Sequence, residues 1–208
     1  TYVYSRAFIE HQWRNLDDAF GDYPHDIHYA VKANSNIAVL NVLAQLGSGF
    51  DIVSAGELYR VLQAGGDASK IVFSGVAKSR SDIEYALNSG VGSLNIESTA
   101  ELKRINSVAL ELGKTARIAL RVNPDVDPQT HPYISTGLAT AKFGISIDAA
   151  LEVYQLANSM ANIQVHGVAC HIGSQITTTS PFSVLRICSI CSSVTVALAT
   201  KSPLERLT

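Results

Sequence analysis

Short apolar, β-rich runs alternate with amphipathic segments along most of this chain, and this alternation limits the folds open to it. The first five runs begin about every 20–25 residues, the length of one strand, one helix and two short loops. The predicted strands are His28–Ala33, Phe50–Val53, Ile71–Ser74, Ser93–Glu97, Arg117–Val122 and Val165–His171. The predicted helices are Ile37–Leu46, Ala55–Ala64, Ser81–Ser89, Thr99–Leu112 and Asp148–Ser159. Such alternation predicts parallel strands with right-handed crossovers.

Three of the helices begin with the pattern of a capping box, in which a hydroxyl and a carboxylate satisfy backbone N–H groups at the helix start. The three pairs are Ser54 with Glu57, Ser81 with Glu84, and Ser98 with Glu101. These starts support the helix boundaries and leave a doubly wound sheet or a (β/α)₈ barrel as the fold.

Two observations favour the barrel. No Gly-x-Gly-x-x-Gly pattern follows any predicted strand, so the usual dinucleotide fingerprint is absent. The polar residues of interest also lie at strand exits, which share one face of a barrel: Lys32, Asp51, Glu97, Arg121 and His171. We therefore predict a (β/α)₈ TIM-type barrel that is incomplete, with about six of its eight strands present.

The composition narrows the class of protein. At 208 residues, with 47% hydrophobic and 16% charged residues, the chain suits one globular domain with a sizeable core. A net charge of −2 and the lack of a basic stripe argue against nucleic acid or an anionic membrane surface as partners. There is no membrane-span-sized apolar run and no signal peptide, and three cysteines suit a reducing cytoplasm. Because the chain lacks an initiator methionine, we expect its true start upstream.

Lys32 ends the first apolar run, just before Asn34-Ser35-Asn36. A buried ammonium is costly unless it is paired or used in its neutral form. Desolvation lowers the pKa of a lysine, and the neutral amine attacks carbonyls to form a Schiff base. Lys32 is therefore a candidate nucleophile, and an ion pair with a carboxylate such as Asp51 is the alternative.

The other candidates also have structural alternatives. Glu57 could act in catalysis or complete a helix cap, and Asp51 could pair with a lysine. Arg121 lies within an apolar strand, so it needs an anion, which could be an internal glutamate or a ligand's phosphate or carboxylate. His171 could hold an aromatic ring or serve as a hydrogen-bonded structural histidine. The remaining histidines have no metal-ligand spacing, and no metal site is predicted.

Taken together, the chain resembles the alanine-racemase-like (fold III) PLP-dependent enzymes, specifically the ornithine/diaminopimelate/arginine decarboxylase group. The matching pieces are Tyr29–Asn36, Gly47–Ser54 with Glu57, Phe73–Gly75, Asn95–Ser98, Arg121–Pro124, His131–Gly137, Lys142–Gly144 and His171–Gln175. Each fragment alone is weak, but their joint order is specific. The stretch from His131 to Gly144 and the Gly-Ser-Gln ending resemble the diaminopimelate branch more than the ornithine branch.

The resemblance implies roles for individual residues. Lys32 is expected to form the internal aldimine with pyridoxal 5′-phosphate (PLP), and Glu57 to face the pyridine nitrogen. His171 is expected to stack on the ring, and Ser174 to donate to the phosphate. Asp51 and Arg121 match pocket residues of the family. The implied reaction is decarboxylation of meso-diaminopimelate, a small amino-acid substrate, to L-lysine and CO₂.

The resemblance also implies a domain organisation. Residues 1–182 are expected to form a partial PLP-binding barrel domain, and residues 183–208 an aberrant tail that is not family-like. The family's C-terminal β-domain is not represented, and the full-length family is expected to work as a homodimer in the cytoplasm. Two alternatives stay open: a catalytically silent fragment or non-enzymatic relative, and another basic amino-acid decarboxylase acting on ornithine or arginine.

Overall fold

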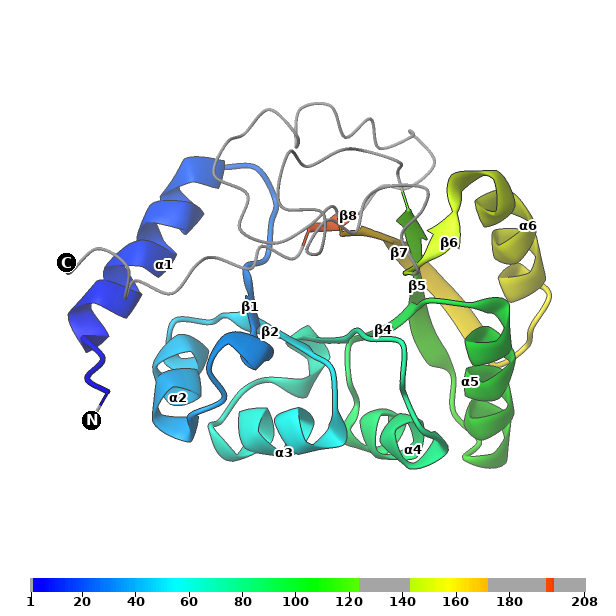
Figure 1. Ribbon diagram of the computed structural model, residues 1–208, viewed down its shortest axis with the longest axis horizontal. Coiled ribbons are helices and arrows are strands. Elements are labelled where there is room, and N and C mark those ends of the chain that lie inside the picture. The colour runs from blue at the N-terminus through cyan, green and yellow to red at the C-terminus, as the bar shows by residue number, and fades with distance from the viewer. Residues whose placement is uncertain (1, 124–142, 172–193, 197–208) are drawn as a thin grey trace.

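Parallel strands follow one another round a curved sheet in the computed structural model, which describes residues 2–123, 143–171 and 194–196 (Figure 1). The strands are β1 (His28–Ala30), β2 (Gly49–Ile52), β3 (Ile71–Phe73), β4 (Ser93–Ile96), β5 (Ala116–Asn123), β6 (Ile145–Ser146), β7 (Ile163–Cys170) and β8 (Val194–Val196). Their order in the sheet is β1-β2-β3-β4-β5-β7-β8, with β6 paired to β5, and every pairing is parallel.

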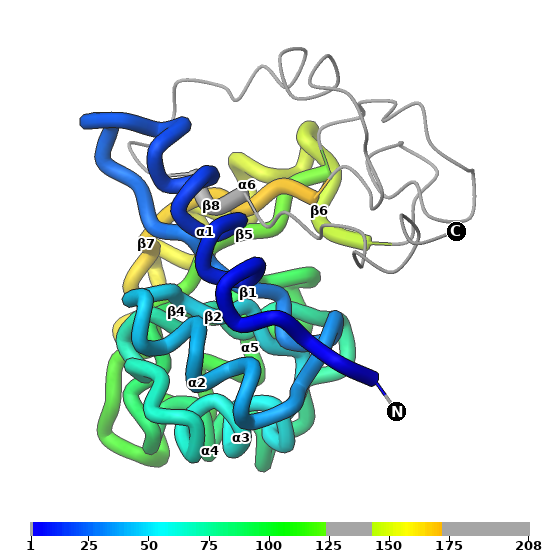
Figure 2. Tube along the Cα trace, turned by 90° about the vertical axis from the view of Figure 1, so that its left-hand side faces the viewer, coloured from blue at the N-terminus to red at the C-terminus, as the bar shows by residue number. Residues whose placement is uncertain are grey.

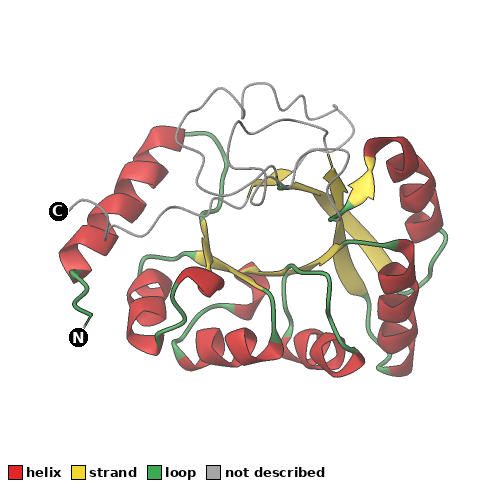
Figure 3. Cartoon of the chain, viewed as in Figure 1, coloured by secondary structure: helices red, strands yellow, loops and turns green. Residues whose placement is uncertain are grey.

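Helices cover the outer side of the curved sheet (Figure 3). They are α1 (Arg6–Phe20), α2 (Ile37–Gln45), α3 (Ala55–Gln63), α4 (Arg80–Ser89), α5 (Thr99–Glu111) and α6 (Ile147–Asn158). Helix α1 lies at the left edge of the molecule in Figure 1, and it crosses in front of β1 and β2 in the view turned by 90° (Figure 2). Helix α1 was not predicted, and it has no buried residue. None of the helices in the described ranges is long and apolar enough to cross a membrane.

The prediction of an incomplete α/β barrel is confirmed. All six predicted strands are present within one to three residues of their expected ends, and two short ones, β6 and β8, were not foreseen. Among the described residues, no hydrogen-bonded pairing joins β1 to β8. Strand β8 lies within residues 183–208, and the proposed domain boundary at residue 182 stays a prediction.

The helix caps correct one detail of the sequence analysis. Helix α4 is capped by Ser79 and Asp82, not by Ser81 and Glu84, because the same pattern occurs two residues earlier. The Asp82 carboxylate accepts the Ser79 N–H at 2.9 Å, and the Ser79 hydroxyl accepts the Asp82 N–H at 3.1 Å. Glu84 instead pairs with Arg80 on the exposed face of the helix. The helix therefore begins earlier than predicted.

The two faces of the sheet differ in chemistry. In parallel sheets, residues in register share a face and side chains alternate along each strand. The face that includes Phe50, Ile52, Phe73, Leu94, Ile96, Ile118 and Leu120 is fully buried against the helices. Asp51, Asn95 and Arg121 have the opposite parity, so they lie on the inner face. The interior therefore becomes polar towards the carboxyl ends of the strands.

A β-bulge interrupts the pairing of β5 with β7. Ile118 pairs with Val165, but Ala119 pairs with Gly167, so His166 is the extra residue in β7. Bulges of this kind change the direction in which the following side chains point. Beyond the bulge, Arg121 is in register with Ala169.

Candidate active site at the carboxyl ends of the strands

Lys32 lies directly after β1, as predicted, but not within a strand. β1 ends at Ala30, and residues Val31–Ala33 form a 3₁₀ turn that carries the lysine. The Lys32 side chain is exposed, which differs from the desolvated amine that its apolar surroundings in sequence suggested. No ion pair among the described residues joins Lys32 to Asp51. The amine at the end of β1 is therefore accessible from the mouth of the barrel.

Asp51 is buried on the inner face of β2, with 8% of its surface exposed. Its Oδ1 accepts a hydrogen bond of 2.5 Å from the Ser74 hydroxyl, and the Asn95 amide donates to the same hydroxyl at 3.0 Å. Burial raises the pKa of Asp51 above its ordinary value, although the Ser74 bond and the positive charge of Lys32 oppose the shift. This carboxyl can therefore hold a proton at a higher pH than an exposed aspartate.

Glu57 occupies the first turn of α3, where the Ser54 hydroxyl accepts the Glu57 N–H at 3.2 Å. The Glu57 Oε2 accepts a 2.7 Å hydrogen bond from the backbone N–H of Val53. Ser54 therefore caps the helix, but the Glu57 carboxylate bonds the N–H one residue before the cap, so the reciprocal bond of a capping box is not made. Its role opposite a pyridine nitrogen stays a prediction.

The anion that Arg121 requires is an internal glutamate. Arg121 Nη1 donates to Glu97 Oε1 at 2.7 Å, and both side chains are largely buried. The other Glu97 oxygen accepts the Gly144 N–H at 3.1 Å, and the Arg121 guanidinium lies 5.4 Å from the centre of the Phe143 ring. The Arg121 guanidinium is therefore held in place by the Glu97 carboxylate, which pairs with one of its nitrogens.

His171 directly follows β7 and is partly buried. Burial, reinforced by the charges of Arg121 and Lys32, lowers the pKa of its imidazole to about 4. The ring is therefore neutral at physiological pH. Ser174, the predicted phosphate donor, lies outside the described residues.

The electrostatic partners show that the candidates share one site. Lys32, Glu57 and Arg121 all act on the carboxyl of Asp51, and Arg121 and Lys32 both act on the imidazole of His171. Five of the six predicted site residues are thus brought together from four strand ends: Lys32, Asp51, Glu57, Arg121 and His171. The sixth, Ser174, is not described.

Sequence reasoning missed the polar residues that support this set. Ser74 and Asn95 hold Asp51, and Glu97 was noted only for its place at a strand exit. Each lies in the last residues of β3 or β4 or directly after them, and this position was the available signal. Asn95 Oδ1 is buried without a hydrogen-bond partner among the described residues.

The strand ends carry an exposed amine (Lys32), a carboxyl whose pKa is raised (Asp51) and a neutral imidazole (His171). This set is typical of an α/β-barrel domain in which an amine reacts with a bound cofactor. Residues 6–200 match the profile of the family described as pyridoxal-dependent decarboxylase, pyridoxal binding domain. The chain belongs to this family. The family's members are decarboxylases, and their cofactor is PLP.

The relatives carry consistent names. The chain is 61% identical to diaminopimelate decarboxylase of Vibrio cholerae over 87% of its length, and 62% identical to that of Haemophilus influenzae, also over 87%. The crystal structure of diaminopimelate decarboxylase from Helicobacter pylori complexed with L-lysine superposes with a TM-score of 0.84 at 46% identity, covering 86% of this chain. The chain spans 43–45% of the length of these relatives.

The residues present fit such a cofactor. An aldehyde can condense with an amine, which the exposed Lys32 supplies, and a flat ring can stack on a neutral imidazole, which His171 supplies. Asp51 adds a carboxyl whose pKa is raised, and Arg121 adds a positive charge close enough to act on that carboxyl. The donor set thus agrees with the family.

Replacing Asp51 with asparagine is expected to stabilise the chain at neutral pH by about 0.5–2 kcal/mol, the usual gain from a single stabilising substitution. Ionised Asp51 loses hydration on folding, whereas an amide oxygen can still accept from Ser74. Because the folded pKa is raised, the stability that Asp51 lends at low pH is lost as pH rises through that pKa. The gain from Asp51→Asn should therefore grow with pH above about 4, as measured by thermal unfolding across a pH series.

The matched control is Asp82→Asn in the cap of α4. Burial opposes ionisation of Asp82, but bonds from Ser79 and Ala55 outweigh it and hold its pKa below the ordinary value. The same substitution should therefore destabilise the chain there, by about 1 kcal/mol. Loss of stability in Asp51→Asn at neutral pH would contradict the first expectation.

Proposed function

We propose that this chain is the lysine-bearing part of a PLP-dependent enzyme that decarboxylates meso-diaminopimelate to L-lysine and CO₂. The observation that carries the proposal is the convergence of Lys32, Asp51, Arg121 and His171 at the strand ends. The names of the relatives, at 61–62% identity, support diaminopimelate as the substrate. The lysine bound in the Helicobacter pylori structure is the product expected of this reaction.

Each residue has a physical task in this proposal. PLP, when bound, supplies an electron sink for the carbanion that loss of CO₂ leaves behind. Lys32 presents its amine to the cofactor aldehyde, and it must lose a proton before it can attack. Asp51 lies within electrostatic range of that amine and can take up such a proton, because burial favours its protonated form. His171, uncharged, can lie against the ring without competing for its protons.

Arg121 and Glu97 together set the charge on the inner face of the sheet at the ends of β4 and β5. Glu97 balances the guanidinium from one side and fixes its direction, so the cation can face an anionic group of the cofactor or substrate. Ser174 keeps its proposed role as a phosphate donor, and Glu57 its proposed role towards the pyridine nitrogen. We further propose a cytoplasmic homodimer, with the remaining substrate contacts supplied by parts of the protein outside this sequence.

The decisive test is covalent labelling. The chain is treated with PLP, reduced with borohydride and mapped by peptide mass spectrometry; we expect the label at Lys32. Lys32→Met should abolish it, whereas Lys70→Met, at an exposed site at the opposite end of the strands, should not. Equal labelling of several lysines, or labelling that persists in Lys32→Met, would contradict the assignment of the cofactor site.

The substrate is tested by CO₂ release from meso-diaminopimelate, ornithine and arginine. We expect release from meso-diaminopimelate by the full-length protein, and no appreciable release by the 208-residue chain alone. The chain alone spans less than half of its relatives, which favours the catalytically silent fragment as the second candidate. Release from ornithine but not from meso-diaminopimelate would overturn the choice of substrate.

A further inference from the structure

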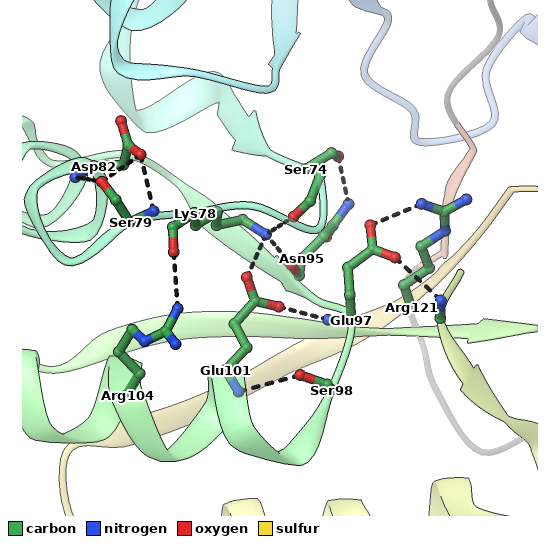
Figure 4. A network of polar contacts seen from close by, with 12 residues as sticks. Ser74, Lys78, Ser79, Asp82, Asn95, Glu97, Ser98, Glu101, Arg104 and Arg121 are labelled. Carbon is green, nitrogen blue, oxygen red and sulfur yellow. Dashed lines mark hydrogen bonds and ion pairs between the residues drawn. The ribbon is translucent and has the colours of Figure 1, made fainter. Parts of the chain in front are cut away.

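A buried ion pair lies behind the site, between the β3–α4 loop and α5 (Figure 4). Lys78 Nζ lies 2.9 Å from Glu101 Oε1, and their side chains are 0% and 6% exposed. The ammonium also donates to the backbone carbonyls of Gly75 at 2.6 Å and Asn95 at 2.7 Å. All three N–H donors of the Lys78 ammonium are therefore used within the protein, and none is left to bind a ligand.

The pair is connected to the site through Glu97. The second oxygen of Glu101 accepts the backbone N–H of Glu97 at 2.7 Å. The Glu97 carboxylate in turn accepts from Arg121 at 2.7 Å and from the Gly144 N–H at 3.1 Å (Figure 4). Lys78 is therefore connected through Glu101 and Glu97 to the Arg121 guanidinium on the inner face of β5.

Helix capping does not explain the buried lysine. Helix α3 begins in the same way as α5: Glu57 bonds the Val53 N–H just as Glu101 bonds the Glu97 N–H, and a serine caps each helix. Yet α3 forms with no lysine on its glutamate among the described ion pairs. Burying an ammonium costs several kcal/mol before pairing offsets it. The start of α5 therefore does not require Lys78, and the buried lysine has a role other than stabilising the start of this helix.

We infer that Lys78 and Glu101 are positioning residues that hold the end of β4 in place, so that Glu97 keeps Arg121 fixed in the cofactor site. Lys78 ties the β3–α4 loop to the carbonyl of Asn95, and Glu101 ties down the amide of Glu97 two residues later. Together they fix the strand ends that carry Ser74, Asn95 and Glu97. The inference rests on the proposed function.

The test uses the double variant Lys78→Met/Glu101→Met in the full chain. It removes both charges at similar volume, so no uncompensated ion is left buried. Without PLP, NMR of the Arg121 guanidinium should show separate Nη signals in the parent chain, where Glu97 restrains rotation, and averaged signals in the variant. With PLP, the dissociation constant should rise by about tenfold to a hundredfold, the range seen for residues that support ligand-holding groups.

The matched control is Arg80→Met/Glu111→Met, which removes an exposed ion pair between α4 and α5. Both readouts should stay unchanged in this variant. A second test variant, Glu101→Asp, keeps a charge for Lys78 but shortens the reach to the Glu97 amide, and it decides the matter where the double variant does not fold. We expect averaged Arg121 signals in Glu101→Asp as well.

Separate Arg121 signals in a folded test variant, together with an unchanged PLP dissociation constant, would overturn the inference and leave the pair a purely structural one. The NMR readout needs no cofactor. If the parent chain bound no PLP, the proposed function would fail, while the signals of Arg121 would still decide whether Lys78 and Glu101 position it.

Discussion

Lys78→Met alone is expected to lower the free energy of unfolding by about 3–5 kcal/mol, the cost measured when one partner of a buried ion pair is removed. The variant leaves Glu101, 6% exposed, with the Glu97 N–H as its described hydrogen-bond donor and no counter-charge. It also leaves the carbonyls of Gly75 and Asn95 without the donor they now have. Few single surface changes in a chain of this size approach this effect.

Urea unfolding followed by circular dichroism measures this loss. The double variant Lys78→Met/Glu101→Met should regain part of it, because no buried charge is then left without a counter-charge. The Gly75 and Asn95 carbonyls and the Glu97 N–H still lose their partners in the double variant, so the recovery is incomplete. The exposed control Arg80→Met/Glu111→Met should change stability by no more than about 1 kcal/mol. A single variant as stable as the parent chain would show that the ammonium is not buried as described.

Gly92→Ala is expected to destabilise the chain by about 3 kcal/mol or more, at the upper end for overpacking. An added Cβ would clash with the backbone oxygen of Ser69 and lie 3.2 Å from that of Ile71. These atoms belong to the backbone that enters β3, so no side chain can rotate away to make room. The Gly92 N–H also donates to the Ala68 carbonyl at 3.0 Å, which fixes the approach.

The control for Gly92→Ala is Gly56→Ala, on the exposed side of α3. There an added Cβ has 3.8 Å to its nearest neighbour, the Ser54 hydroxyl. Alanine in a helix is more favourable than glycine by about 0.5–1 kcal/mol, so this variant should be slightly more stable. Thermal unfolding of the two variants should thus give shifts of opposite sign. A neutral Gly92→Ala would mean that β3 and β4 approach less closely at their amino ends.

Much of the barrel could be predicted because its signals are local. Apolar runs of strand length, amphipathic segments and serine caps located five helices and six strands to within a few residues. The errors also have local causes. The run ending in Lys32 continues past β1 as a 3₁₀ turn, and α4 starts at the earlier of two similar serine patterns. Helix α1 was not predicted, although Ser5 caps its start and Ile9 and Trp13 pack against the core.

The site could be predicted only in part, because its contacts depend on register. Lys32, Asp51, Arg121 and His171 could be located from their places at strand ends. The sequence could not show whether a glutamate or a ligand pairs with Arg121, because the answer depends on the register of β4 with β5. Nothing in the segment around Lys78 indicates that its amine reaches Asn95 and Glu101 across the fold. Local patterns do not encode such long-range contacts.

The extra residue in β7 decides which functional group arrives at the mouth of the barrel. Because His166 is accommodated as a bulge, Arg121 is in register with Ala169. If the same residues were paired without the bulge, His166 would lie beside Ala119 and Val168 beside Arg121, and every later side chain of β7 would be displaced by one position. The outer loops of such a barrel can lengthen or shorten at little cost, but the first half of β7 cannot. A one-residue shift in that pairing would turn the later side chains of β7 to the other face of the sheet and change the groups at its carboxyl end.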